Sequence, residues 1–105
     1  MEQSLNETDK RILVTEDNLH PHLKARMQQR GVTRKEIECT LNEGWKAADA
    51  KEGTFGKIMV FSYQTEWEGQ FYEEKEVTVY YKFVDNCLIL LTVKARYGKN
   101  FCRGE

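Results

Sequence analysis

The chain has 105 residues, of which 40% are hydrophobic and 11% aromatic, with a single proline. This length suits one domain, and the apolar fraction can offset the entropy of ordering the chain, which excludes two independent cores and wholesale disorder. The 16 basic and 17 acidic residues give a formal net charge of −1. The total charge therefore favours neither a nucleic acid nor a membrane as partner.

Residues 1–10 are polar and show no apolar periodicity, which predicts a flexible leader followed by a single domain over 11–105. The longest apolar run, Cys87–Leu91, is far shorter than the roughly 18 to 20 residues of a membrane helix. The N-terminus has no signal-peptide pattern. We therefore expect a soluble, cytoplasmic protein without a membrane partner.

A first helix is predicted after a short extended segment, Ile12–Val14. Asn18 is expected to cap this helix, and Pro21 lies in its early turn, where a missing amide donor is tolerated. The helix is predicted to continue to about Arg30, with Gly31 as its C-terminal stop.

A second helix is predicted to start with a capping box. Thr33 and Glu36 have the spacing at which a hydroxyl and a carboxylate each satisfy a free amide at a helix start. This helix is expected to run to about Asn42 and to end at Gly44.

After Gly44 the pattern changes from helical to alternating, with aromatic and β-branched residues, which predicts an antiparallel sheet of three or four strands. We expect strands over 45–50, 57–63, 76–83 and 87–95, turns at 53–56 and 85–86, and an acidic loop over 64–74. The last strand is apolar on both faces, so a central position in the sheet is predicted. Two N-terminal helices packed on this sheet give an α+β fold.

The charges are segregated along the chain. The segment 18–35 carries five basic residues and both histidines without an acid, and 94–105 is also basic, whereas 36–52 and 66–76 are acidic. If the fold brings the two basic segments together, an anion site follows. Alternatively, these charges lie on solvated faces and pair with the acidic segments.

A stripe of His22, Arg26 and Arg30 borders the buried face of the first predicted helix. Arg30 lies between Leu23 and Met27 in angle, so we expect its stem to be buried and its guanidinium to reach toward the sheet edge. This stripe suits a phosphate, with the histidine moving protons. The alternative is structural: His22 bonds a backbone group, and Arg30 pairs with a glutamate of the sheet.

The first helix resembles the opening of the family called domain of unknown function 4258 through a spaced set of residues: His22, Arg26, Met27, Arg30, Gly31, Val32 and Thr33. The segments 75–82 and 90–98 resemble strands of this family in pattern, so that the resemblance covers about 12–101. The family is grouped with small metal-independent ribonuclease toxins of the barnase, colicin and RelE type. The resemblance therefore implies two N-terminal helices on a four-stranded antiparallel sheet.

The same resemblance implies an RNA-cleaving activity, in which a ribose 2′-hydroxyl attacks the adjacent phosphate without a metal. His22 would be the acid or base, Arg26 and Arg30 the phosphate clamp, and Arg96 and Tyr97 supporting donors. The implied partners are RNA and a cognate antitoxin protein, and no cofactor is expected.

A non-catalytic protein-interaction module is the alternative function. In this hypothesis Trp67, Phe71 and Tyr72 of the acidic segment 64–74 present an aromatic contact surface to a partner or to a second copy of the chain. These aromatic side chains are equally suited to fold back over the sheet as core. Both functions stay open on the sequence.

The three cysteines, Cys39, Cys87 and Cys102, are an odd number without a CxxC pair, which argues against a disulfide framework. We expect Cys39 and Cys87 to be buried and Cys102 to lie in a fraying tail. A metal site of His20, His22 and a cysteine is disfavoured, because side chains two apart on a helix point apart.

Overall fold

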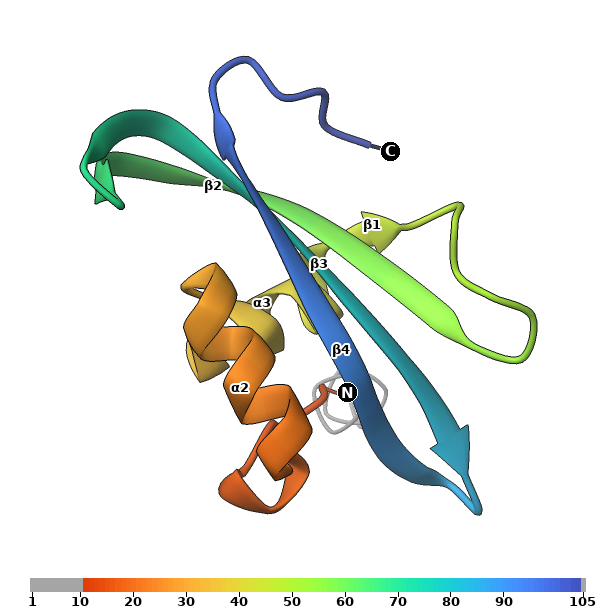
Figure 1. The fold of residues 1–105 in the computed structure, drawn as a ribbon. Helices are drawn as coiled ribbons and strands as arrows, with labels where there is room; N and C mark the ends of the chain where they lie inside the picture. Colours follow the sequence, from red (N-terminus) through yellow and green to blue (C-terminus); the bar gives the residue numbers. More distant parts are fainter. Residues whose placement is uncertain (1–10, 105) are drawn as a thin grey trace, which may run out of the picture.

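A computed structural model describes residues 11–104 (Figure 1). The predicted leader over 1–10 lies outside the described residues. In chain order the elements are η1 (Glu16–Asn18), α2 (Pro21–Arg30), α3 (Arg34–Glu43), β1 (Trp45–Lys46), β2 (Phe55–Trp67), β3 (Gln70–Val84) and β4 (Cys87–Gly98). The predicted α+β class is confirmed, with the helices N-terminal to a four-stranded antiparallel sheet.

Local sequence signals set the ends of α2. Pro21 is its first residue, and Gly31 follows its last at φ +73°, a left-handed conformation that glycine adopts without steric cost. The predicted cap was wrong, because His20 caps the helix through Nδ1, which accepts from the Leu23 amide at 3.2 Å. Asn18 instead ends the separate turn η1.

The predicted capping box of α3 is confirmed. The Thr33 hydroxyl accepts from the Glu36 amide at 3.1 Å, and a Glu36 carboxylate oxygen accepts from the Thr33 amide at 3.0 Å. The segment Ile12–Val14 forms no strand and lies along α3, where the Val14 amide donates to Glu38 at 2.8 Å.

The sheet has the order β1-β2-β3-β4, and every neighbouring pair is antiparallel. The predicted central position of the last strand is therefore wrong, because β4 is an edge strand. Its side chains Leu90 and Val93 are buried because α2 lies along this strand, whereas Ile89 is exposed (Figure 1). His20 bonds this edge directly, with Nε2 2.9 Å from the main-chain oxygen of Leu90.

The segment 64–74 is a hairpin and not the predicted loop. β2 continues to Trp67, β3 starts at Gln70, and the turn has Glu68 and Gly69 at φ +52° and +87°. This hairpin extends past the main sheet contacts with exposed polar residues on both strands, so its sequence lacks a clear alternation. The first strand is also shorter than predicted, at Trp45–Lys46.

The two helices cover one face of the sheet. Val77 and Val79 of β3 are fully buried there against Leu23 of α2 and Ile37 of α3. The opposite face, which we call the second face, carries Glu76, Thr78 and Tyr80 of β3 beside Lys94 and Arg96 of β4. The loop after β1 and the C-terminal tail, rather than helices, lie over this second face.

Candidate functional site

The five residues that the sequence singles out lie in three places. Arg30 and Arg96 line one hollow on the second face. His22 and Arg26 line a separate hollow on α2 with Ala25 and Gln29 of the same helix. Tyr97 packs against the aromatic residues of the β2–β3 hairpin. The structure therefore brings two of the five together and does not gather all of them around one cavity.

The hollow on the second face has a volume of about 490 Å³. We call it the arginine hollow, and its polar and charged lining residues are Arg30, Asp49, Glu76, Thr78, Tyr80, Lys94 and Arg96. They come from α2, the loop after β1, and strands β3 and β4. The fold thus brings together the two basic segments that are far apart in the sequence.

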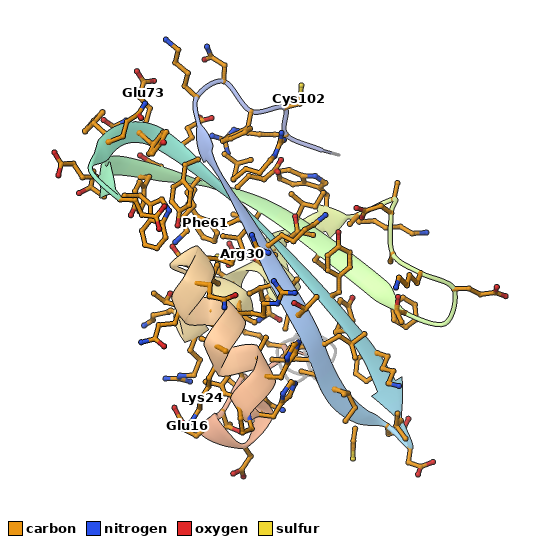
Figure 2. All side chains as sticks on the ribbon, viewed as in Figure 1. Glu16, Lys24, Arg30, Phe61, Glu73 and Cys102 are labelled. Atoms are coloured by element: carbon orange, nitrogen blue, oxygen red, sulfur yellow. The ribbon has the colours of Figure 1, made fainter. Side chains whose placement is uncertain are left out.

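Arg30 reaches the arginine hollow from the last position of α2, beside β4 (Figure 2). The hydroxyl of Tyr97 donates to the main-chain oxygen of Arg30 at 2.5 Å and fixes this helix end against the strand. The Arg30 Nε is buried without a hydrogen-bond partner. The sequence predicts a buried stem, and Arg30 as a whole is half-buried; within residues 11–104 no carboxylate pairs with the guanidinium.

The other two cations of the hollow are paired. Arg96 donates to the two carboxylate oxygens of Glu76 at 2.9 and 3.3 Å, and these bonds raise the pKa of the guanidinium. Lys94 lies 3.3 Å from Asp49, which also accepts from the Tyr80 hydroxyl at 2.9 Å. The Tyr80 hydrogen bond, followed by that of Lys94, lowers the pKa of Asp49.

The charges in the arginine hollow do not cancel. Three cations, Arg30, Lys94 and Arg96, face two carboxylates, Asp49 and Glu76, which leaves one net positive charge. An arginine presents five N–H donors in a planar fork that matches an oxyanion. The hollow can therefore accept one phosphate or carboxylate group, with the unpaired Arg30 as its first contact.

The histidines have different environments. His22 is exposed, whereas His20 accepts from the Leu23 amide through Nδ1 and therefore donates through Nε2 to Leu90. The backbone hydrogen bond that the sequence analysis considered for His22 is therefore made by His20 instead. The two rings are parallel, with centroids 6.2 Å apart. Over residues 11–104, no three His, Cys, Asp or Glu side chains come together in a way that could hold a metal ion.

Tyr97 packs among aromatic side chains and does not face the arginine hollow. Its ring stacks on Trp67 at a centroid distance of 5.2 Å and contacts the rings of Tyr63 and Tyr72. Burial raises the pKa of Tyr97 well above its usual value, so the phenol stays protonated and donates to Arg30. Trp67 and Tyr72 thus fold back onto the sheet, whereas Phe71 at the hairpin remains 54% exposed.

The sequence analysis missed a buried ion pair. Lys75 of β3 is 2% exposed and donates to both carboxylate oxygens of Glu36. The alternation of β3 carried the signal, because Lys75 is two residues before the inward-facing Val77. Its ammonium lies 5.4 Å and 5.5 Å from the ring centroids of Tyr63 and Tyr97.

Two of the three cysteines are more exposed than predicted. Cys87 is exposed at the start of β4, and Cys39 is half-buried on α3, where burial followed by the Glu43 charge raises the pKa of its thiol. Cys102 is exposed, but the tail that carries it is held by hydrogen bonds to Glu74 and is not frayed as predicted. A raised thiol pKa lowers the population of the nucleophilic thiolate, so Cys39 is poorly suited to react.

The helices of the described part have ten residues each at most, and none could cross a membrane. Comparisons with protein-family models, with curated proteins and with solved structures give no match to this chain. The assignment of function therefore depends on the geometry of the arginine hollow and on the sequence resemblance.

Proposed function

We propose that the arginine hollow binds a phosphate of single-stranded RNA and that the protein is a metal-independent endoribonuclease of the toxin type. The observation that supports this most directly is the Arg30 guanidinium, which has a buried Nε without a partner in a hollow of net positive charge. Arg30 and Arg96, two of the residues implied by the resemblance, line this hollow.

The proposed reaction is attack of a ribose 2′-hydroxyl oxygen on the adjacent phosphorus, which releases the 5′-oxygen of the next nucleotide and leaves a 2′,3′-cyclic phosphate. The 2′-hydroxyl gives its proton to a base, and the leaving oxygen takes one from an acid. Arg30 and Arg96 hold the phosphate and stabilise the charge that develops on its oxygens. His22, the acid or base implied by the resemblance, lies about 12 Å along α2 from Arg30 in a separate hollow, too far to exchange a proton with a phosphate held there. Asp49, Glu76 and Tyr80 line the arginine hollow and are therefore the proposed proton-exchanging groups.

Arginine substitutions on α2 test the phosphate contact. Arg30→Ala is expected to reduce the rate of cleavage of a single-stranded RNA by about 100- to 1,000-fold, the usual cost of losing a donor that stabilises the transition state. Arg26→Ala removes a cation of the same helix outside the hollow and is the matched control for loss of general positive charge. Equal cleavage by wild type and Arg30→Ala, or no cleavage by wild type, would contradict the proposal.

A separate variant tests the proton transfer. His22→Ala is expected to leave both the cleavage rate and the RNA affinity close to wild type, because the histidine lies outside the arginine hollow, whereas Glu76→Gln is expected to lower the cleavage rate. Slower cleavage by His22→Ala at unchanged RNA affinity would contradict this expectation and would return His22 to the role that the resemblance implies.

The second candidate function is a protein-interaction module, and exposed apolar residues favour it. Phe55 and Phe83 are 50% and 49% exposed and lie 6.4 Å apart between ring centroids, beside Tyr81. Such a cluster suits a partner protein or a second copy of the chain. Sedimentation of the wild type and of Phe83→Ser tests it, because self-association should weaken in the variant, and a monomer at all concentrations would oppose a homodimer.

A further inference from the structure

Arg96 is held from two sides although its side chain is 68% exposed. On one side its Nε and Nη2 donate to the Glu76 carboxylate. On the other side its guanidinium carbon lies 4.9 Å from the centroid of the Phe101 ring, a distance at which the ring face attracts a cation. Two N–H donors are used by Glu76, so three of the five remain for a ligand.

The C-terminal tail after β4 places the Phe101 ring. Asn100 has φ +58°, which reverses the chain after the strand. The Phe101 amide then donates to a carboxylate oxygen of Glu74 at 2.9 Å. Gly98 allows the ring to lie close to the strand, since a Cβ at this position would be 3.2 Å from the ring.

The end of the tail is anchored independently of Phe101. Arg103 donates to the second carboxylate oxygen of Glu74 at 2.9 Å and to the main-chain oxygen of Val60 at 3.1 Å. Glu74 therefore holds the tail at two points, the Phe101 amide and the Arg103 guanidinium, which keeps the Phe101 backbone beside the strand. A ring placed in this way restricts the rotamers of the arginine that it contacts.

We propose that Phe101 is a positioning residue, which holds the Arg96 guanidinium at the rim of the arginine hollow so that its free N–H donors meet the bound phosphate. This proposal rests on the proposed function for its ligand. The tail thereby becomes part of the binding site without lining the hollow. Without the Phe101 ring, Arg96 would be held on one side only, by Glu76. Its exposed side chain would then have to be ordered when the ligand binds.

The Arg96 side chain can be observed directly in the protein without RNA. In ¹⁵N-labelled full-length protein, the heteronuclear NOE of the Arg96 Nε–H reports its order, and Arg96→Lys assigns the signal. Phe101→Leu keeps an apolar side chain but removes the aromatic face, so the NOE is expected to fall. Phe101→Trp keeps an aromatic face and is expected to retain the wild-type NOE. An unchanged NOE in Phe101→Leu, or an equal loss in both variants, would overturn the proposal.

Binding of fluorescein-labelled hexauridylate gives the functional readout. Phe101→Leu is expected to weaken binding by about two- to five-fold, the usual range for one exposed cation–π contact, and Phe101→Trp is expected to bind as the wild type does. Wild-type affinity in Phe101→Leu would overturn the positioning role and leave the RNA proposal in place. If the wild type binds no RNA while Phe101→Leu still mobilises Arg96, the RNA proposal fails and the ordering of Arg96 by the tail stands.

Discussion

The ammonium group of Lys75 on β3 donates to both carboxylate oxygens of Glu36 on α3, at 2.8 and 3.0 Å. The same ammonium donates to the main-chain oxygen of Gly31, and Glu36 also accepts from the Thr33 amide. One buried cation thereby joins the end of α2, the start of α3 and the middle of the sheet. Because all three of its donors are used, Lys75 is a structural group and not a free site.

Removal of this cation should destabilise the protein strongly. In Lys75→Met the half-buried Glu36 carboxylate loses its counter-charge, so we expect the free energy of unfolding to fall by about 3 kcal/mol in a denaturant titration. Arg11→Ala, which breaks an exposed pair with Glu43, should cost less than about 1 kcal/mol. Equal losses in the free energy of unfolding for the two substitutions would show that burial of the Lys75 ion pair does not add to its contribution to stability.

Two glycines with positive φ allow a matched test of the turn after α2. A Cβ at Gly31 (φ +73°) would lie 2.6 Å from the Trp67 ring and 2.7 Å from the Tyr97 hydroxyl, whereas a Cβ at Gly53 (φ +84°) would meet nothing within 4 Å. Gly53→Ala should therefore cost only the backbone strain, about 1 kcal/mol.

Gly31→Ala carries the same strain and must also displace the aromatic contacts, so we expect a cost larger than that of Gly53→Ala by about 1 kcal/mol or more. Thermal unfolding of both variants measures the difference. A Gly31→Ala variant no less stable than Gly53→Ala would indicate that the β2–β3 hairpin is not held against the helix turn through Trp67.

The helices could be predicted from the sequence because their ends depend on local chemistry. Pro21, Gly31 and the pair Thr33 and Glu36 act within one turn of where they stand, so one sequence is sufficient to locate them. Arg30 could also be placed beside the sheet, because its angle on the helix follows from the helical repeat. The same local reasoning could not reveal that its Nε would lack a partner.

The position of β4 and the β2–β3 hairpin could not be predicted for a different reason. A strand that is apolar on both faces is usually central, and nothing in the sequence of β4 says that a helix covers its edge. Likewise, the outer hairpin has no clear alternation, and only Gly69 marks its turn. The arginine hollow depends on the first of these features, since Arg96 reaches it from this edge strand and Arg30 from the helix beside it.

The Asp49 carboxyl should respond to loss of the Tyr80 hydroxyl. Its pKa lies below the usual 3.8 because of the hydrogen bond from Tyr80, followed by that from Lys94. In Tyr80→Phe we expect this pKa to rise toward the usual value, as measured by NMR titration of the carboxyl carbon. An unchanged pKa would mean that the loop after β1 does not contact Tyr80 in solution.

The same carboxyl should make stability depend on pH. Because the folded-state pKa is depressed, the contribution of ionised Asp49 is present above the unfolded-state pKa and is lost as the pH falls through the folded-state value. The difference in free energy of unfolding between wild type and Asp49→Asn should therefore be larger at about pH 7 than below about pH 3. A difference that is the same at both pH values would contradict this linkage.

Arg30 is expected to lower the free energy of unfolding and to increase the affinity for single-stranded RNA. Its Nε is buried without a partner, and a buried polar group in this state costs about 1 to 3 kcal/mol. Arg30→Met keeps an unbranched apolar stem and removes the unsatisfied group, so we expect the free energy of unfolding to rise by about 1 kcal/mol. Affinity for single-stranded RNA should fall by about ten-fold or more, because a charged hydrogen bond to the phosphate is lost.

Arg26→Met is the control for this last pair of effects, since it removes a cation of the same helix that does not line the arginine hollow. It should change the free energy of unfolding and the RNA affinity much less than Arg30→Met does. A loss of stability in Arg30→Met would show that the guanidinium is satisfied in solution, and the argument for an anion at this position would then lose its main support. A gain in stability together with a loss of affinity is the combination typical of a residue kept for binding and not for folding.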